Sequence, residues 1–380
     1  MKTIKFYSYG LLTIAAGLFL GYQFRIYNLK KSAQQDIDFI HQTILQNHPG
    51  PYNDQDPDFV NNMNAALQSA KSSIASITSS KDHADMIKKL LTSFHDTHVR
   101  MYPKSQETTS TKTLDIKHFS MNQMPGDIVW ITLPTFAPNK EQQQELETII
   151  DQISKYRSSK QIVFDVRSNT GGSSQWGTKI LESLFGKEYA SQKLYDMNKN
   201  IVVDWCASKD NAAYLTSLTS LIKDQLGADS SEVSEFKAVE QGIQQAYKDH
   251  KVFYTEHIPE QSMPKIKTHC PVTAKVIIIT SSRCVSSCLD FIDEIKAIDP
   301  KAILIGETTD ADSIYMEVRT VDLPSGIGKL QFPIKMYRNR PRGNNVPYIP
   351  NVAYPKNLLS QEDKNQWLTQ IVQKLSQGNI

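Results

Sequence analysis

The sequence predicts an α/β protein that begins with a helical part. Two hydrophobic runs, "QIVFDVR" (161–167) and "AKVIIIT" (274–280), each lead through a turn into an apolar pattern with helical spacing. Such alternation of strands and helices favours a largely parallel sheet with crossover helices. Nearer the N-terminus the pattern is helical throughout, and Ile37, Ile40 and Ile44 recur on one face of an expected helix.

Further expected elements extend this pattern. Strands are expected at 127–133 and 301–306, helices at 83–99, 139–157, 176–186 and 286–298, and a hairpin turning at "LPSG" at 315–339. A polar, helix-rich insert spans about 186–265. The chain is thus expected to have three parts. Residues 1–30 form a signal peptide or membrane anchor, and residues 31–102 form an N-terminal helical domain. Residues 103–380 form an α/β domain that contains the insert.

The N-terminus has the composition of an export or anchor segment. Between Lys5 and Arg25 lie 19 uncharged and mostly apolar residues, a length that suits a signal peptide or a single membrane anchor. No small-x-small cleavage site follows, so we expect a membrane tether through residues 6–24 and a periplasmic or extracellular location in the cell envelope. Lys and Arg total 42 against 40 Asp and Glu, which gives no electrostatic reason to expect a nucleic-acid partner.

The four cysteines leave several possibilities open. Cys206, Cys270, Cys284 and Cys288 allow three complete disulfide pairings, and their spacing does not choose among them. The spacing also lacks the clustered ligands of a zinc site, so neither a metal nor another cofactor is expected. Cys284 and Cys288 either form a local bridge or act as two small buried hydrophobes.

A strand-to-helix junction at "TSSRCVSSCLDF" (280–291) concentrates hydroxyl side chains. The apolar spacing after it places Ser286 or Ser287 at the N-cap or in the first turn of a helix. A serine there ordinarily caps free backbone N–H groups, which contributes about 1 kcal/mol. The same position also suits a nucleophile, because the helix start offers partial positive charge and N–H donors for an oxyanion.

Two glycines follow the earlier buried strand in "FDVRSNTGGSS". Gly171 and Gly172 either form a plain turn or let the backbone approach a ligand, and a free glycine N–H would serve as a second oxyanion donor. A serine nucleophile also needs a base. His98, in "FHDTHV" near the expected end of a helix, is the best candidate, although a lone histidine is more often structural.

In this order, these stretches resemble the S41 peptidase family of tricorn-core and C-terminal-processing peptidases. "DVRSNTGG" matches the family's Asp-x-Arg-x-Asn-x-Gly-Gly turn, "ITSSRCVSSCLDF" is similar to its serine-containing helix start, and "LIGETT" matches its Gly-Glu-x-Thr strand end. "DTH" and "GDIVWITLPTF" resemble its upstream histidine segment and an earlier strand. The resemblance covers about residues 35–355 and implies a crotonase- or ClpP-like β-α catalytic domain with an N-terminal helical domain and a helical insert.

The resemblance also implies roles for individual residues. Ser286 matches the nucleophile when the motif is aligned on Phe291 of "SCLDF", whereas counting back from Gly306 gives Ser287. Ser286 is preferred, because its Cys-x-Ser-small-Cys setting at the helix start resembles an exported subgroup of the family. The oxyanion donors would be the N–H of Ser287 and that of Gly171 or Gly172.

Departures from the family pattern narrow the implied mechanism. The lysine of a Ser–Lys dyad is missing, because its position falls near Asp312. A tricorn-like histidine base is implied instead, which fits His98. The acid that orients this histidine is left open among Glu307, Asp312 and Asp96. About 25 residues separate the histidine segment from "GDIVWITL", too few for a PDZ domain.

We therefore expect an exported serine peptidase that acts on peptides or proteins. A non-catalytic ligand-binding protein on the same scaffold is the alternative, since the usual lysine is missing and Leu289 stands where the family often has Glu. An esterase with the same groups is a further alternative. Arg338, Arg340 and Arg342 would either recognise a substrate carboxylate or form an ordinary solvated edge.

Overall fold

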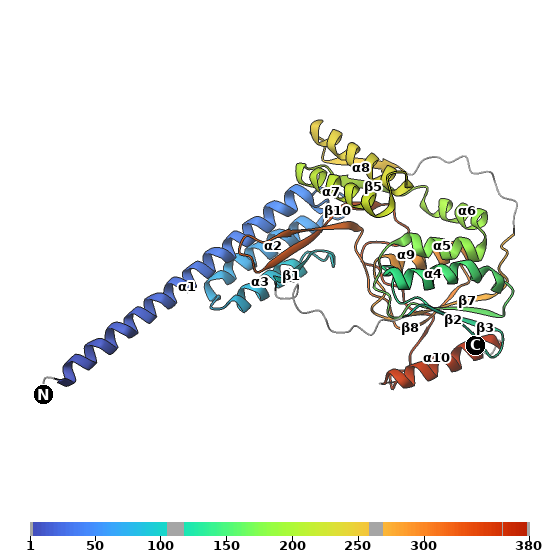
Figure 1. Cartoon of the computed structure of the whole chain (residues 1–380), viewed down its shortest axis with the longest axis horizontal. Coiled ribbons are helices and arrows are strands. Elements are labelled where there is room, and N and C mark those ends of the chain that lie inside the picture. Colours follow the sequence, from blue (N-terminus) through green and yellow to red (C-terminus); the bar gives the residue numbers. More distant parts are fainter. Residues whose placement is uncertain (1–2, 105–117, 258–268, 359, 378–380) are drawn as a thin grey trace. The chain divides into compact units, whose positions relative to one another are not determined.

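The computed structural model describes residues 3–104, 118–257, 269–358 and 360–377. The chain forms two compact units, each assembled from three separate segments (Figure 1). Unit 1 comprises Met1–Lys112, Val202–Glu256 and Tyr315–Arg338, and unit 2 comprises Thr113–Ile201, His257–Ile314 and Asn339–Ile380. The predicted α/β class with a helical N-terminal region is confirmed.

Unit 1 begins with helices. These are α1 (Thr3–Asn47), α2 (Asp58–Ser73) and α3 (Ser80–Thr92), with the short 3-10 helices η1 (Gly50–Tyr52) and η2 (Ile74–Ser76) between them. A capping box starts α3, because Ser79 Oγ accepts from the N–H of Asp82 and the Asp82 carboxylate accepts from the N–H of Ser79. The helix ends at Thr92, earlier than predicted, and the loop that follows carries His98.

A five-stranded sheet completes unit 1. β10 (Gly328–Arg338) pairs antiparallel with β1 (Arg100–Pro103), β5 (Val202–Cys206) and β9 (Tyr315–Asp322), and β6 (Phe253–His257) neighbours β5. The hairpin of β9 and β10 confirms the predicted one, with Asp322 opposite Lys329. The helices α7 (Lys209–Leu226) and α8 (Ser231–Lys248) come from the predicted insert, which also supplies β5 and β6, two strands that the sequence pattern did not indicate.

Unit 2 contains a six-stranded sheet in the order β11-β8-β7-β4-β3-β2. The parallel strands β3 (Ile128–Thr132), β4 (Gln161–Asp165), β7 (Lys275–Thr280) and β8 (Ile303–Gly306) are the four predicted from hydrophobic runs. β2 (Ser120–Met124) pairs antiparallel with β3, and β11 (Val352–Ala353) pairs parallel with β8. Because β4 and β7 are adjacent and parallel, the loops that follow them emerge at the same edge of the sheet.

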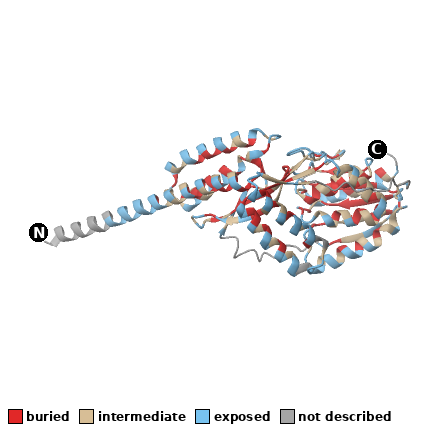
Figure 2. Cartoon of the chain, turned by 90° about the horizontal axis from the view of Figure 1, so that it is seen from above, coloured by how far each residue is buried: buried red, intermediate tan, exposed pale blue. Residues whose placement is uncertain are grey.

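Helices cover both faces of this sheet. α4 (Lys140–Gln152), α5 (Ser174–Phe185), α6 (Lys187–Asn198) and α9 (Ser287–Ile298) pack on one face, and α10 (Gln361–Ser376) packs on the other (Figure 1). A hydrophobic core lies on each face of the sheet, and alternate strand residues point into one or the other. Ile162 and Phe164 belong to the core on the α9 side, and Val163 belongs to the core on the α10 side. The strands are accordingly buried on both faces (Figure 2), and the hydrophobic runs of the sequence reflect this position.

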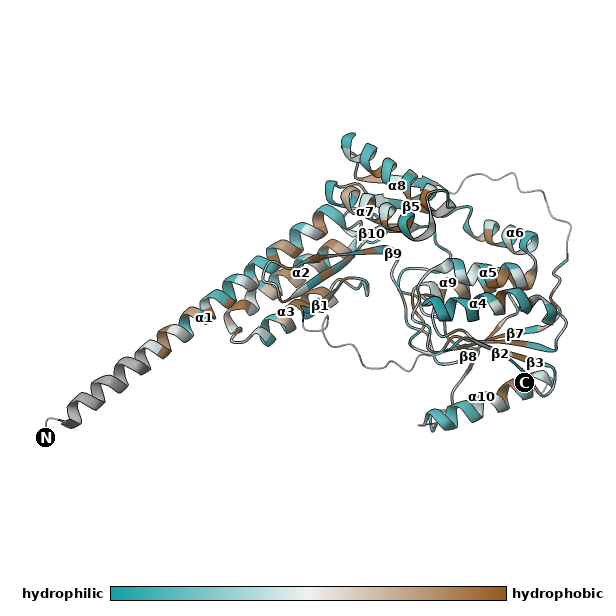
Figure 3. Cartoon of the chain, viewed as in Figure 1, coloured by the Kyte–Doolittle hydropathy of each residue, from teal (hydrophilic) through white to brown (hydrophobic). Residues whose placement is uncertain are grey.

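Hydropathy varies along the helices, which mix hydrophobic and hydrophilic residues (Figure 3). α1 contains residues 6–24, the predicted tether. Within the described residues, none of the helices combines the length and the apolar character that a membrane crossing requires.

Candidate active site

The loop between β7 and α9 turns sharply at Ser286. The N–H of Cys288 donates to Val285 O at 3.3 Å, so residues 285–288 form a tight turn with Ser286 in its second position. Ser286 has φ 59° and ψ −132°, a conformation that costs a residue other than glycine about 1–3 kcal/mol. Its side chain stands at the N-cap position of α9 but makes no capping hydrogen bond. Capping therefore does not account for this serine.

The glycine loop after β4 lies directly against Ser286. Gly171 and Gly172 have φ values of 97° and 139°. A Cβ on Gly171 would lie 2.9 Å from Ser286 Cβ and 3.3 Å from Ser286 Oγ, and a Cβ on Gly172 would lie 2.1 Å from backbone atoms of Phe136. Only glycine fits both positions. Unit 2 thus brings Ser286, Gly171 and Gly172 together.

Asn169 determines which N–H groups of the glycine loop are free. Its Oδ1 accepts from the N–H of Gly171 at 2.9 Å, and its Nδ2 donates to Leu133 O at 3.2 Å. The Gly171 N–H is therefore occupied. Across the described residues, no hydrogen-bond acceptor is found for the N–H groups of Gly172 and Ser287. These two N–H groups would be the donors available if an oxyanion formed at Ser286.

A disulfide joins Cys284 to Cys288, one on each side of Ser286, with Cα atoms 5.4 Å apart. Both cysteines are fully buried in the core of unit 2, and Cys288 lies in the first turn of α9. Cys206 and Cys270 are free thiols, so the local bridge is the alternative that the structure adopts. The bridge closes the loop that contains Ser286 and limits its conformational freedom.

His98 lies in unit 1, in the loop between α3 and β1. Its Nδ1 is 3.4 Å from Asp96 Oδ1, which also accepts from the His98 backbone N–H at 2.9 Å. Asp96 is buried, and its Oδ2 lies 3.2 Å from His48 Nε2. Burial alone would raise the pKa of Asp96, but the contacts with His48 and His98 hold it well below its ordinary value. The ionised carboxylate of Asp96 therefore faces Nδ1 of His98 and leaves the other ring nitrogen, Nε2, on the far side of the imidazole.

Glu307, another of the candidate acids, lies in unit 2 directly after β8. Its Oε1 accepts from Lys364 Nζ at 2.7 Å, and its Oε2 accepts from the N–H of Ser282 at 3.4 Å. The hydrogen bond from Lys364 lowers the pKa of Glu307. This carboxylate links the end of β8 to α10 and to the loop before Ser286.

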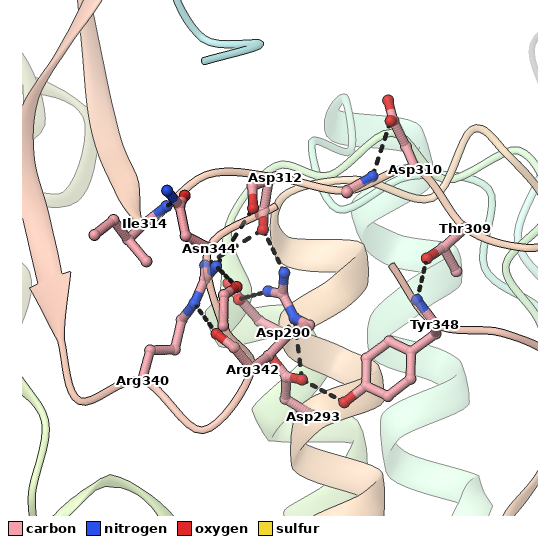
Figure 4. A network of polar contacts seen from close by, with 12 residues as sticks. Asp290, Asp293, Thr309, Asp310, Asp312, Ile314, Arg340, Arg342, Asn344 and Tyr348 are labelled. Carbon is pink, nitrogen blue, oxygen red and sulfur yellow. Dashed lines mark hydrogen bonds and ion pairs between the residues drawn. The ribbon is translucent and has the colours of Figure 1, made fainter. Parts of the chain in front are cut away.

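Asp312, the remaining candidate acid, is fully buried in a network of charges (Figure 4). Arg340 and Arg342 both pair with it, and Arg342 Nε lies 3.0 Å from Asp293 on α9. Tyr348 donates to the same Asp293. Residues 309–312 and 340–348 are thereby tied to the helix that begins at Ser287.

The three arginines considered for substrate recognition are all paired with carboxylates of the chain. Arg338 pairs with Asp54 and Asp204 in unit 1, whereas Arg340 and Arg342 belong to the Asp312 network. The side chain of Arg342 is only 3% exposed. The alternative of a solvated edge is therefore wrong for Arg342, because its charge is neutralised inside unit 2.

The sequence comparison decides the family. The model of "Peptidase family S41" matches residues 127–347, more than half of the chain. The chain belongs to peptidase family S41. The matched region contains the glycine loop, Ser286, Glu307 and Asp312, whereas His98 and Asp96 lie upstream of it. Membership of this family supports a peptidase function for the chain.

Solved structures resemble this S41 member over most of its length. Mature CPAF complexed with lactacystin is 11% identical, with 92% of this chain and 99% of that chain covered and a TM-score of 0.58. A lipoprotein from Streptococcus agalactiae is 15% identical, with 90% and 96% covered and a TM-score of 0.44. At such identities the CPAF similarity shows the fold alone. Among curated proteins, none matches the sequence.

Carboxylates on α9 shape the electrostatics around the helix start of this S41 member. Burial raises the pKa of Asp290 to about 6, with Asp312 adding to the rise and Ser174 opposing it. Burial also raises the pKa of Glu294 to about 8. Glu294 is therefore mostly protonated at neutral pH, so α9 carries less negative charge than its acidic residues imply.

A cavity of about 610 Å³ opens at the carboxyl ends of the parallel strands of the unit 2 sheet in this S41 member. Arg167, Ser168, Ser282, Arg283, Glu307 and Lys364 are among the residues that line it. The two loops that bring Ser286 and the glycine pair together therefore also form part of its wall. An open sheet edge of this kind is a common position for a ligand.

Several features of this S41 site were not evident from the sequence. No sequence pattern singled out His48, yet its Nε2 lies 3.2 Å from Oδ2 of Asp96, the carboxylate that faces His98. The backbone conformation of Ser286 and the occupied N–H of Gly171 depend on contacts between distant segments. For Asp96, the spacing in "DTH" was the one indication of its contact with His98, because a carboxylate two residues before a histidine is able to reach its ring.

Proposed function

We propose that this S41 member is a serine peptidase in which Ser286 is the nucleophile and His98 the base. The observation that carries the proposal is the environment of Ser286: a strained helix start against a glycine loop, with two N–H groups unbonded among the described residues. Strain of this kind persists where function requires it, and serine nucleophiles are commonly held on such turns.

The proposed reaction is acyl transfer. Ser286 Oγ attacks the peptide carbonyl carbon while its proton passes to His98 Nε2, and the oxyanion accepts hydrogen bonds from the N–H groups of Ser287 and Gly172. The C–N bond then breaks, and the leaving amine takes the proton from His98. A water molecule, deprotonated by the same imidazole, then attacks the ester; the C–O bond to Ser286 breaks, His98 returns the proton to Ser286 Oγ, and the acid is released.

Asp96 is the acid that we assign to orient His98. Its contact with His98 Nδ1 supports this choice over Glu307 and Asp312, whose carboxylates pair with Lys364 and with arginines. Ser286 and His98 belong to different units, so their cooperation is part of the proposal. It has a kinetic signature: Ser286→Ala, His98→Ala and the double variant should lose activity to about the same extent, because groups that act as one unit are not additive.

Labelling with a serine-reactive fluorophosphonate tests the proposed nucleophile. The full chain should react with one equivalent, and peptide mapping should place the adduct on Ser286, with no adduct in Ser286→Ala. Quenched peptide libraries and matched ester substrates then separate peptidase from esterase. Absence of labelling and of hydrolysis would instead support the ligand-binding alternative, which the missing lysine and Leu289 motivate.

We also propose that the protein is exported and tethered to the membrane through residues 6–24. The disulfide between Cys284 and Cys288 supports export, since such bonds persist mainly in oxidising compartments. Fractionation of cells that express the full chain and a variant lacking residues 1–30 tests both parts. The full chain should sediment with membranes and be open to protease added outside the cytoplasm, and the shortened chain should do neither.

A further inference from the structure

His48 is a fully buried imidazole whose hydrogen bonds fix its protonation. It follows α1 directly, and its Nδ1 accepts from the N–H of Gly50 at 2.9 Å. A ring nitrogen that accepts carries no proton, so the proton is on Nε2. That Nε2 lies 3.2 Å from Asp96 Oδ2, within reach for donation.

Aromatic rings hold His48 in this orientation. The Phe59 ring is stacked on it at 4.8 Å with 17° between the planes, and the Tyr315 ring lies 4.8 Å away on a tilted plane. Tyr315 is itself fixed, because its hydroxyl donates to Asp56 at 2.9 Å and accepts from Asn53 at 3.1 Å. The imidazole therefore has little rotational freedom.

We infer that His48 is a positioning residue for catalysis, which rests on the proposed function: it clamps Asp96 so that Asp96 holds His98 with its proton on Nδ1. One carboxylate oxygen faces His48 Nε2, and the other faces the backbone N–H and Nδ1 of His98. A carboxylate bound at both oxygens cannot rotate away from either partner. His98 Nε2 is then unprotonated and able to accept a proton from a nucleophile.

Two substitutions separate this role from simple packing. His48→Phe keeps an aromatic ring between Phe59 and Tyr315 but removes the donor to Asp96. His48→Gln restores a donor, because the amide nitrogen of Gln reaches the position of imidazole Nε2. We expect kcat to fall about 10–100-fold in His48→Phe with KM almost unchanged, and to recover to within about threefold of wild type in His48→Gln.

A matched control comes from another buried histidine in unit 1. His83 Nε2 lies 3.0 Å from Asp36 Oδ2, and both side chains are fully buried. His83→Phe should lower the thermal midpoint as His48→Phe does, because each breaks a buried contact. It should leave kcat unchanged, since Asp36 does not contact His98 in the described structure.

Nitrogen-15 NMR of the histidine-labelled full chain tests the inference without relying on activity. Wild type should show His48 protonated at Nε2 and His98 at Nδ1, with the His98 tautomer mixed in His48→Phe and restored in His48→Gln. A proton on His48 Nδ1, or an unchanged His98 tautomer and kcat in His48→Phe, would overturn the inference. If wild type hydrolyses nothing, the proposed function fails while the tautomers still decide whether His48 acts on His98.

Discussion

Replacement of Ser286 by alanine will abolish peptide hydrolysis while leaving the free energy of unfolding almost unchanged. The Ser286 hydroxyl makes no capping bond, so its removal takes no stabilising contact from α9. The backbone strain stays, because alanine is as unsuited as serine to a φ of 59°. We expect kcat/KM to fall by at least about 10⁴-fold, as for the loss of other serine nucleophiles. Steady-state kinetics and denaturant unfolding of the same preparation measure both.

Ser286→Gly tests the backbone strain at this turn. Glycine adopts the conformation of this turn readily, so the variant should be as inactive as Ser286→Ala but more stable by about 1 kcal/mol. A variant that is more stable but inactive would show that serine at this position lowers the stability of the fold and is needed for activity. A less stable Ser286→Gly would show instead that the strain is not present.

Ser287→Ala is the matched control and separates the two candidate nucleophiles. The Ser287 side chain is buried, and its Oγ has no hydrogen-bond partner among the described residues. Its proposed contribution is the backbone N–H, which alanine retains. Activity within about threefold of wild type is expected. If Ser287→Ala were inactive and Ser286→Ala active, the roles would be reversed.

The core of unit 2 could be predicted because its signals are local. The runs that became β3, β4, β7 and β8 have unbroken hydrophobic centres, which is typical of strands covered on both faces. Turn residues marked the ends of these strands and of the β9–β10 hairpin. By contrast, β5 and β6 belong to the polar, helix-rich insert, where β5 pairs with the distant β10 and β6 neighbours β5. The sequence analysis also did not predict α10, because its buried residues are identified by their contacts with the sheet.

The residues of the candidate site also fall into those that local sequence predicts and those that depend on distant contacts. Gly171, Gly172 and the serine pair were found because their residue types are unusual after a strand or at a helix start. The orienting acid could not be chosen, since Glu307, Asp312 and Asp96 differ in their partners and not in their chemistry. Asp312 contacts arginines about 30 residues later, and Asp96 contacts His48. No local pattern encodes such pairings.

Asp96→Asn should lower kcat by about 10³–10⁴-fold, the second large effect that we expect. The amide cannot provide two acceptors, so it no longer holds the proton of His98 on Nδ1. Stability should also fall by about 2–3 kcal/mol at neutral pH, because buried hydrogen bonds to a carboxylate are lost. The pKa of Asp96 is lowered in the folded state, so its contribution is complete above the ordinary pKa of a carboxyl group and is lost as the pH falls below it. The difference in unfolding free energy from wild type should therefore be constant from about pH 5 to 8 and shrink below about pH 4.

Equivalent acid-to-amide changes at the other two candidates identify the orienting acid. Glu307→Gln replaces a partly exposed carboxylate beside Lys364 and should lower kcat less than about tenfold. Asp312→Asn leaves Arg340 and Arg342 without their shared partner, so it should cost about 3–5 kcal/mol of stability, with kcat of the folded fraction largely retained. Only Asp96→Asn should combine a large loss of kcat with a folded protein at neutral pH. If Glu307→Gln produced that combination instead, the acid would be Glu307, and the contact between Asp96 and His98 would serve only to hold the loop between α3 and β1.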